Sequence, residues 1–162
     1  SLLTDEIKAK KVDIASITQA AISETGIDHH IPIVAYTEIG NQANTLILGN
    51  KDLLTQAIGN VLTRALDVTP KDEAVTVRIE QRNDNIIISI DDCGPPIPPS
   101  ERREIFHFDC DNEDPQVSLP VAWETAQRHH GDLVAADGEK GMRFTFTFPS
   151  AEKFIQSESI SF

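Results

Sequence analysis

Apolar residues recur along much of the chain at spacings that predict helices. The clearest case is 52–66, where they return at i, i+1, i+4 and i+5 and form one wide apolar face. A polar stripe of Gln56, Asn60 and Arg64 runs beside that face at i, i+4 and i+8. Weaker helical spacing and helix-start residues predict further helices over 12–24, 100–105 and 119–129.

Strands are predicted where short apolar runs are bounded by turn residues. The strongest is 86–90, in which every residue except Ser89 is isoleucine. A polar turn joins this strand to 74–80, so the two are expected to form a hairpin. The same reasoning predicts a last hairpin from 133–136 and 142–148, and short strands over 31–39 and 45–48. Because 31–39 contains a proline, it is expected at a sheet edge.

The order of these elements favours an α+β fold. A two-layer α/β sandwich, with one mixed sheet and the helices on one face, is the economical packing, because each helix carries one apolar stripe. Residues 12–149 are expected to form this domain. Residues 1–11 are interpreted as a linker or the end of a preceding helix, and residues 150–162 as a polar tail. The acidic stretch 107–117 lacks apolar periodicity and is expected to be a mobile loop.

Composition narrows the classes of function. The 162 residues suffice for one domain with a substantial core. The net charge is -12, from 26 acids against 14 bases, and no cluster of Lys and Arg occurs, so nucleic-acid binding is not expected. No apolar run reaches the roughly 20 residues that cross a bilayer, so no direct membrane contact is expected. Cys93 and Cys110 are interpreted as reduced thiols of a cytoplasmic protein.

One stretch joins a buried strand to polar chemistry. The strand 86–90 ends at two carboxylates, Asp91 and Asp92, and the chain then enters a Gly-Pro-Pro turn that begins at Gly94. A rigid strand can hold a carboxylate in place, and a glycine loop lets the backbone approach a ligand closely. This strand end is therefore a candidate binding site.

Three segments, in this order, resemble the ATP-binding catalytic domain of sensor histidine kinases, in the GHKL superfamily of gyrase, Hsp90, kinase and MutL. The segment LLTQAIGNVLTRALDVTP resembles the N box of that family, N-L-L-x-N-A-x-K-Y-T-P. The segment IDDCGPPIPPSERREIF resembles the first glycine box, D-x-G-x-G-I-P, and the helix after it. The segment RHHGDLVAADGEKGMRFTFTFP resembles the closing H-G-G, strand and G-x-G-x-x-F. The likeness covers roughly 12–149 and implies a Bergerat-type fold.

The resemblance implies a ligand and residues that bind it. In that family the ligand is ATP with magnesium, and the aspartate of the first glycine box, which matches Asp92, accepts the adenine amino group. Asn60 matches the first asparagine of the N box. Gly94 and Ile97 fall on the first glycine box, and Gly141 matches the glycine of the closing hairpin.

The resemblance also implies partners and a setting. In that family the phosphate goes to a histidine on a separate dimerisation domain. The implied partners are therefore a dimerisation or histidine phosphotransfer domain, or a response regulator. The chain would belong to a larger dimeric sensor protein, as a cytoplasmic part or the cytosolic part of a membrane-anchored sensor.

Departures from the family pattern fall at the phosphate end of the implied site. The second N-box asparagine, a magnesium ligand in the family, is Arg64 here, and a guanidinium has no acceptor for a cation. The second glycine of the first box is Pro96, and the second glycine box is replaced by 117–121, which contains no glycine. The acids of 107–117 would repel a triphosphate. ATP and magnesium are thus implied cofactors that these departures argue against.

Alternatives stay open for the two key side chains. Asp92 is either a nucleotide ligand or an acid that caps a loop. Arg64 either contacts phosphate in place of magnesium, or pairs with Asp67, Asp91 or an acid of 107–117 across an emptied pocket.

Two functions follow from these alternatives. The first is a degenerate histidine-kinase domain with weak or no ATP binding, which acts as a pseudokinase through protein contacts. The second is an active catalytic domain that phosphorylates a histidine on a separate dimerisation domain. None of the five histidines has the context of a phosphoacceptor, and neither histidine pair has the spacing of a metal site, so no metal ligand and no catalytic residue is assigned. Trp123 is expected in the core or half-buried.

Overall fold

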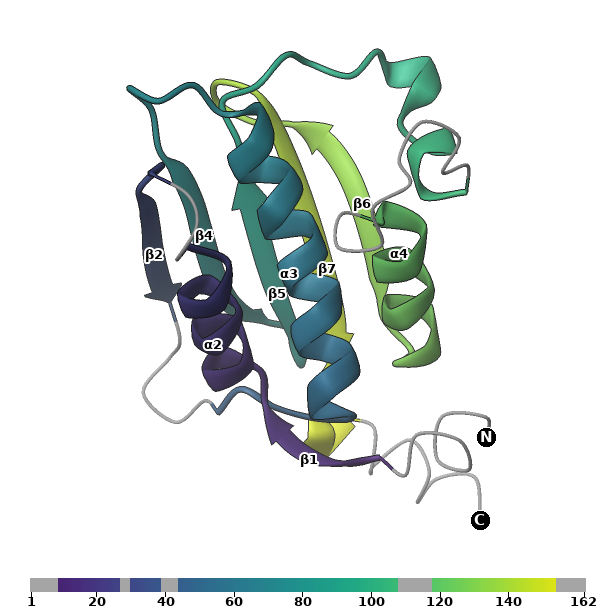
Figure 1. Ribbon diagram of the computed structural model, residues 1–162. Helices are drawn as coiled ribbons and strands as arrows, with labels where there is room; N and C mark the ends of the chain where they lie inside the picture. The colour runs from purple at the N-terminus through teal and green to yellow at the C-terminus, as the bar shows by residue number, and fades with distance from the viewer. Residues whose placement is uncertain (1–8, 27–29, 39–43, 108–117, 154–162) are drawn as a thin grey trace.

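The helices and strands form two layers. A computed structural model of the chain describes residues 9–26, 30–38, 44–107 and 118–153. Within these residues, the helices cover one face of a five-stranded sheet (Figure 1). The strands, in their order across the sheet, are β2 (Ile33–Glu38), β4 (Val75–Arg82), β5 (Asn85–Asp91), β7 (Met142–Pro149) and β6 (Asp132–Asp137). The helices are α2 (Ile14–Gly26), α3 (Lys51–Val68) and α4 (Leu119–Arg128).

The predicted α+β class and two-layer arrangement are confirmed. β2 runs parallel to β4 and the other neighbours in this sheet are antiparallel, so the sheet is mixed. β2 lies at one edge, as its proline indicated, and β6 lies at the other. Both predicted hairpins, β4–β5 and β6–β7, are present. None of the described helices is long and apolar enough to span a membrane.

α3 is the central helix of the helical layer. It begins after Asn50, whose side chain accepts a hydrogen bond from the backbone N–H of Leu53 at 3.0 Å and so satisfies a donor of the first turn. The apolar face predicted for this helix is buried with the helix-facing side chains of the sheet. The resulting core includes Leu54, Ile58, Leu62, Ile86, Ile88, Ile90, Phe144 and Phe146. This packing fixes the polar stripe of α3 relative to the end of β5.

The first predicted helix begins later than its periodicity indicated. Residue 12 lies in a short strand, β1 (Lys10–Asp13), which pairs antiparallel with β3 (Leu46–Gly49) in a separate two-stranded sheet. The cause is Asp13, whose carboxylate accepts hydrogen bonds from the backbone N–H of Ala15 and the hydroxyl of Ser16, both at 3.1 Å. An aspartate in this position is a strong N-cap, so α2 starts at the next residue.

Two turns are tighter than predicted. The turn between β4 and β5 consists of Asn83 and Asp84 alone, with φ of 52° and 64°, and Asn and Asp tolerate this left-handed region better than most residues. The helix expected over 100–105 is instead two 3-10 turns, η1 (Pro99–Glu101) and η2 (Glu104–Phe106). Both turns are formed by i→i+3 hydrogen bonds, and they lie in the segment between β5 and α4.

The chain continues in the fold beyond the last strand. The backbone N–H of Ser150 donates to the carbonyl of Asp84 at 2.9 Å, and Ala151 is buried. Residues 150–153 therefore pack against the β4–β5 turn, although the sequence placed them in a polar tail. Most of the acidic stretch 107–117 and the remainder of the expected tail lie outside the described residues.

Candidate functional site

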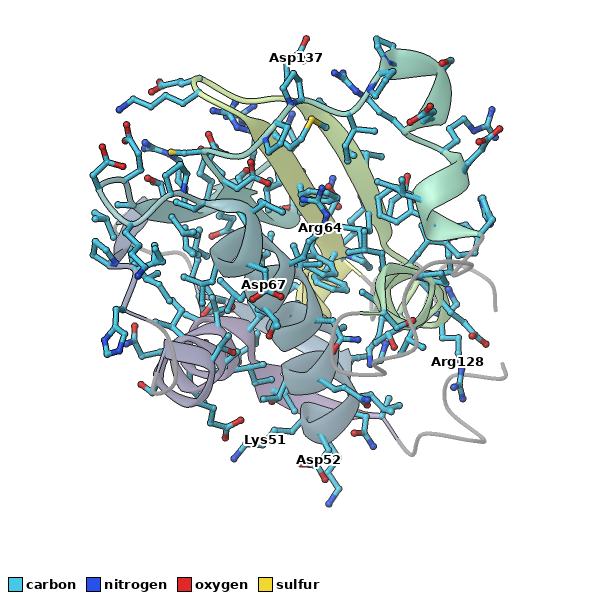
Figure 2. All side chains as sticks on the ribbon, turned by 45° about the horizontal axis from the view of Figure 1, so that its top comes forward. Lys51, Asp52, Arg64, Asp67, Arg128 and Asp137 are labelled. Atoms are coloured by element: carbon cyan, nitrogen blue, oxygen red, sulfur yellow. The ribbon has the colours of Figure 1, made fainter. Side chains whose placement is uncertain are left out.

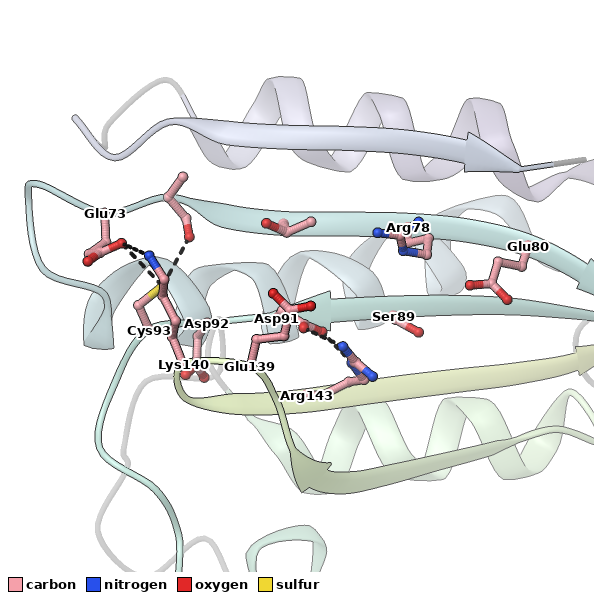
Figure 3. Close-up of a pocket in the computed structure, with 12 residues that line it drawn as sticks. Glu73, Arg78, Glu80, Ser89, Asp91, Asp92, Cys93, Glu139, Lys140 and Arg143 are labelled. Carbon is pink, nitrogen blue, oxygen red and sulfur yellow. Dashed lines mark hydrogen bonds and ion pairs between the residues drawn. The ribbon is translucent and has the colours of Figure 1, made fainter.

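Asp91 and Asp92 direct their side chains to opposite faces of the sheet. Successive residues of a strand alternate in this way, and the two carboxylates follow the rule. Asp92 lies on the helical side, where its side chain is 1% exposed. Asp91 lies on the open side, where it binds Arg143 (Figure 3). The end of β5 thus delivers one buried carboxylate, that of Asp92, to the helical layer.

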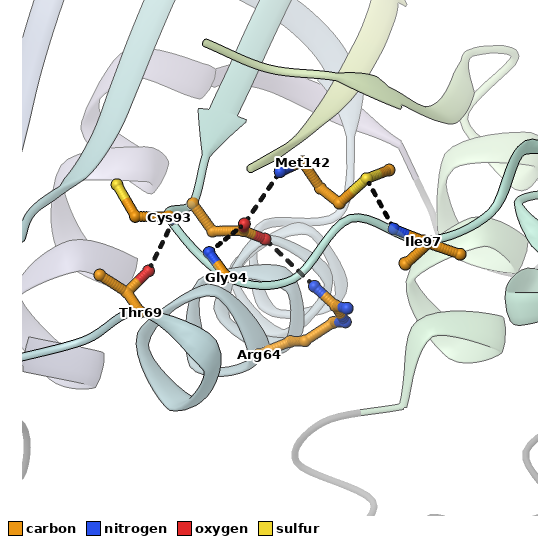
Figure 4. Close-up of polar contacts among 7 residues, drawn as sticks. Arg64, Thr69, Cys93, Gly94, Ile97 and Met142 are labelled. Carbon is orange, nitrogen blue, oxygen red and sulfur yellow. Dashed lines mark hydrogen bonds and ion pairs between the residues drawn. The ribbon is translucent and has the colours of Figure 1, made fainter. Parts of the chain in front are cut away.

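The carboxylate of Asp92 accepts hydrogen bonds through both oxygens (Figure 4). Its Oδ1 accepts from the backbone N–H of Gly94 at 3.0 Å and from that of Met142 at 2.9 Å. Its Oδ2 accepts from Nη1 of Arg64 at 3.2 Å. The backbone N–H of Asp92 donates to the carbonyl of Met142 at 2.9 Å, which ties the strand end to β7. The carboxylate is therefore fixed in position by main-chain groups on one side and by a guanidinium on the other.

Two predicted glycines let the backbone reach this carboxylate. A Cβ on Gly141 would lie 2.4 Å from Oδ1 of Asp92, and a Cβ on Gly94 would lie 2.6 Å from a methyl carbon of Val68. Both distances are far below van der Waals contact, so any side chain at either position would displace the loop. The glycines of the two boxes are therefore required by close approach rather than by a positive φ.

Arg64 reaches Asp92 from the C-terminal half of α3. Figure 2 shows it over the strand ends, away from Lys51 and Asp52 at the start of the helix. Its side chain is 20% exposed, and its guanidinium carbon lies 5.1 Å from the centre of the Phe144 ring, within the range of a cation–π contact. Asp92 is a partner of Arg64 that the sequence did not suggest, and the acids of 108–117 lie outside the described residues.

The loop after Asp92 is fixed by contacts on both sides. The backbone N–H of Cys93 donates to Oγ1 of Thr69 at 3.1 Å, at the end of α3. The backbone N–H of Ile97 lies 3.4 Å from the sulfur of Met142, and the carbonyl of Ile97 accepts from Nε of Arg102 at 3.0 Å. The predicted residue Ile97 thus holds the loop over β7 without touching Asp92 itself.

Asn60 lies apart from the group around Asp92. It is buried, and its Nδ2 donates to the carbonyl of Ser118 at 3.0 Å. Ser118 is the N-cap of α4 and accepts from the backbone N–H of Val121 at 3.3 Å. Asn60 therefore connects the middle of α3 to the start of α4, a structural contact that the sequence did not predict.

The family is identified by a sequence match. A family described as histidine kinase-, DNA gyrase B- and HSP90-like ATPases matches residues 49–152, more than half of the chain. The chain belongs to this family. The match includes the residues that surround Asp92, from α3 through β7.

Curated relatives with this domain are sensor kinases. The probable sensor kinase SilS of Salmonella typhimurium is 27% identical over 118 residues, which are 68% of this chain and 24% of the relative. The adaptive-response sensory kinase SasA of Synechocystis is 29% identical over 111 residues, which are 64% of this chain and 29% of the relative. The chain therefore spans about a quarter of the length of these proteins.

Solved structures share the fold. A mycobacterial sensor histidine kinase, MprB, superposes with a TM-score of 0.76 at 22% identity, covering 87% of this chain and 97% of that one. The catalytic domain of the histidine kinase ThkA, in a nucleotide-free form, gives a TM-score of 0.75 at 18% identity, covering 90% of this chain and 98% of that one. The fold of this member of the ATPase family is that of histidine-kinase catalytic domains.

Positions 120–122 in the first turn of α4 have no N–H free for a ligand. Helix N-termini bind phosphate through free backbone N–H groups. In this member of the family, Pro120 has no N–H, that of Val121 donates to the side chain of Ser118, and that of Ala122 donates to the carbonyl of Ser118. Three consecutive positions in the first turn of α4 thus have no N–H left to offer to an anion.

The open face of the sheet holds a second set of charges behind the site (Figure 3). Asp91 accepts from Nε and Nη2 of Arg143 at 2.7 and 2.8 Å, and this hydrogen bonding raises the pKa of Arg143. Lys140 donates to Glu73 at 3.0 Å. These two ion pairs border a cavity of about 310 Å³ that is also lined by Cys93. Burial raises the pKa of the Cys93 thiol. These acids and bases neutralise one another in pairs.

Arg64, Gly94 and Gly141 of the predicted site surround the carboxylate of Asp92. Ile97 belongs to the loop that follows and contacts Met142 and Arg102, and Asn60 contacts Ser118. Two contacts were missed: the backbone N–H of Met142 and the ring of Phe144. The sequence gives no sign of either contact. The first is made by a main-chain group, and Phe144 is one of the alternating apolar residues of β7, which the pattern places in the core. Within the described residues no group of three or more His, Cys, Asp or Glu side chains is arranged to hold a metal ion.

Proposed function

We propose that this chain is the ATP-binding-type domain of a two-component signalling protein, with weak or no ATP binding and a role in protein contacts. The observation that carries the proposal is the contact between Arg64 and Asp92. In the histidine-kinase family that the sequence resembles, the aspartate that matches Asp92 accepts a hydrogen bond from the adenine amino group. Here a guanidinium of the same chain donates to that carboxylate.

Competition for the carboxylate weakens adenine binding. An adenine amino group would have to share Oδ2 with Arg64 or displace it, because Oδ1 already accepts two backbone N–H groups. Hydrogen bonds to a charged group contribute roughly 1.5–3 kcal/mol each, so exchanging a charged donor for a neutral one brings little gain. The cationic guanidinium also stays in contact with the face of Phe144.

The residues at the phosphate end do not fit ATP with magnesium. Arg64 stands where the family has a magnesium ligand, and it has no acceptor atom. The side-chain amide of Asn60 already donates a hydrogen bond to the carbonyl of Ser118. The first turn of α4 has no free N–H at 120–122 that could bind phosphate. We therefore assign no catalytic step and no metal ligand to this chain.

A second candidate function is an active catalytic domain that transfers phosphate from ATP to a histidine on a separate dimerisation domain. The preserved cradle of Asp92, Gly94 and Gly141 favours it. In both cases the proposed partners are a dimerisation or histidine phosphotransfer domain or a response regulator, within a larger dimeric sensor. The proposed location is the cytoplasm, as part of the cytosolic region of a sensor.

Calorimetric titration with ATP and magnesium tests the proposal. We expect no measurable heat from the unaltered chain up to millimolar ATP. A dissociation constant in the micromolar range would contradict the proposal and favour the active domain.

A second titration uses adenosine, which lacks phosphates. Arg64→Asn frees the carboxylate of Asp92, so we expect this variant to gain weak adenosine binding that the Asp92→Asn change removes again. Arg143→Asn is the matched control, because it removes the other arginine–aspartate pair, on the far face of the sheet. If Arg64→Asn binds adenosine no better than the control, occupation of Asp92 is not what prevents binding.

A further inference from the structure

A groove of about 460 Å³ runs beside β6, at the sheet edge farthest from β2. Its walls come from β6, from α4 and from the segment around η2. Leu133, Val134 and Ala135 of β6 form one side, and Phe106 and Trp123 belong to the other. The groove is remote from the cavity on the open face and shares none of the residues around Asp92.

Along this groove, the backbone of β6 has hydrogen-bonding groups that no other described strand pairs with. In an antiparallel ladder the N–H and C=O groups of alternate residues point toward and away from the neighbouring strand. The backbone N–H of Gly138 donates to the carbonyl of Gly141 at 2.8 Å, which sets the phase of the β6–β7 ladder. In that phase, Leu133, Ala135 and Asp137 point away from β7, toward the free edge. No other described strand pairs with β6 there.

The ends of this edge are closed by side chains. The N–H of Leu133 donates to the carboxylate of Asp132 at 2.9 Å, and Asp137 binds Arg102 at 2.6 Å. Between these ends, no group among the described residues pairs with the carbonyl of Leu133 or with the main-chain groups of Ala135. An extended chain is the shape that pairs with such groups, because its own N–H and C=O groups repeat at the same spacing.

Five of the ten residues that line the groove are apolar: Phe106, Trp123, Leu133, Val134 and Ala135. The ring of Trp123 is half-buried and lies 4.7 Å from that of His107, edge to face. Val134 lies on the opposite face of β6 from Leu133 and Ala135 and is 47% exposed, more than any other large hydrophobic residue among those described. Side chains of this kind give apolar surface to the side chains of an added strand.

The charge of the groove contrasts with that of the chain. The whole chain carries a net charge of -12. The described lining of the groove contains two arginines and one carboxylate, Asp132, which already accepts from Gln127 and Leu133. Arg102 is paired with Asp137, so the positive charge offered to a partner is that of Arg103. Arg103 is exposed at the rim. An acidic segment therefore complements this groove better than it complements the chain as a whole.

We propose that the groove binds an extended acidic segment of a partner protein, which adds as a strand to the free edge of β6. Alternate residues of that segment would be apolar and face Trp123, and acidic residues would face Arg103. This specifies a partner class for the protein-contact role proposed above and is independent of nucleotide binding. Absence of peptide binding would leave the proposed loss of ATP binding intact, and ATP binding would leave the groove intact.

The test uses the sole tryptophan of the chain as its reporter. The probe is a synthetic hexapeptide of alternating valine and glutamate, with blocked ends. We expect saturable changes in Trp123 fluorescence and slower hydrogen exchange at the amide of Ala135. The same peptide with every backbone amide N-methylated cannot donate to β6 in either strand orientation, and one with lysine in place of glutamate has the wrong charge, so both should bind at least tenfold more weakly.

Variants of the chain locate the site. Ala135→Pro removes the N–H that the added strand needs, and proline is tolerated on a free strand edge, so affinity should fall at least tenfold while the fold persists. Ala135→Ser keeps the N–H and should bind normally. Arg103→Glu should weaken binding, whereas the matched reversal Arg82→Glu, at the exposed far end of β4, should not.

Three results would overturn the proposal. One is the absence of saturable binding up to millimolar peptide. Another is equal binding of the N-methylated peptide, which would show that no strand forms. The third is a self-association of the chain in sedimentation experiments that Ala135→Pro abolishes, which would show that β6 pairs with a second copy.

Discussion

The two ion pairs at the end of β5 differ in what surrounds them. Arg143 and Asp91 are 42% and 18% exposed, so water screens their attraction, and such a pair contributes at most about 1 kcal/mol. Arg64 and Asp92 are 20% and 1% exposed. The carboxylate of Asp92 has been removed from water almost entirely, and leaving it without a charged or polar partner would be costly. Asp92 therefore requires a donor at Oδ2, and in this chain the donor is internal.

A buried histidine gives the chain a dependence on pH. The Nε2 of His129 accepts from the backbone N–H of Asn50 at 3.0 Å, and Nδ1 lies 2.8 Å from the carbonyl of Thr125. Because Nε2 is the acceptor, the proton of the neutral ring belongs on Nδ1. Burial lowers the pKa of His129 below its ordinary value of 6.5, and the nearby charge of Arg128 acts in the same direction.

The sign of the effect follows from that lowered pKa. The unfolded state takes up a proton near pH 6.5 and the folded state only at lower pH, so the stabilisation is complete above pH 6.5 and is lost as pH falls below it. We expect the free energy of unfolding, measured with urea, to fall between pH 7.5 and 5.5. His129→Gln should flatten this dependence, whereas His130→Gln, at an exposed position, should preserve it. An unchanged slope in His129→Gln would contradict the assignment.

At the level of elements, α4 ends at two neighbouring residues, His130 and Gly131, that have different structural roles. The N–H of Gly131 donates to the carbonyl of Ala126 and that of His130 to Gln127, the pattern of a Schellman motif. The left-handed residue is His130, with φ of 60°, rather than the glycine. Gly131 is needed because a Cβ there would lie 2.1 Å from the carbonyl oxygen of Thr147.

Substitutions at these two positions should therefore have opposite signs. Gly131→Ala must push α4 away from β7, and we expect a loss of about 1–3 kcal/mol in the free energy of unfolding. His130→Gly relieves the unfavourable φ, and we expect a gain of up to about 1 kcal/mol. Urea unfolding followed by circular dichroism measures both. If His130→Gly costs as much as Gly131→Ala, the side chain of His130 has a structural role that outweighs its backbone conformation.

At the scale of the whole molecule, the sequence predicted those helices and strands that a local pattern of apolar residues determines. Isoleucine at 86–88 and 90 indicated β5, and its end indicated Asp92. The partner of Asp92 was missed because Arg64 is 28 residues away in sequence and meets it only through the packing of α3 on the sheet. Strand β1 was missed because only one of its four residues, Val12, is apolar, and because it pairs with β3 outside the main sheet. Contacts that depend on how elements dock could not be derived from either element alone.

The net charge of the whole chain leads to the last prediction. With 26 acids and 14 bases, folding brings like charges together, and this repulsion opposes the compact state. Sodium chloride screens the interaction between exposed charges. The screening length is about 8 Å at 0.15 M and becomes shorter at higher concentration. Screening also weakens ion pairs, but exposed pairs such as Lys140 with Glu73 contribute little at any salt concentration. The relief of repulsion should therefore dominate.

We expect the urea midpoint to rise when sodium chloride is increased from 0.02 to 0.5 M, with an unchanged slope of the transition. The unchanged slope matters, because it shows that the same surface is exposed on unfolding and that salt acts on stability alone. Replacing Glu139 by glutamine, in the exposed turn between β6 and β7, should raise the midpoint at low salt and reduce the further gain from salt. Lys71→Gln, which removes an exposed positive charge, should do the reverse. A midpoint that falls with salt would mean that attractive pairs, rather than the excess of acids, govern the electrostatics of this domain.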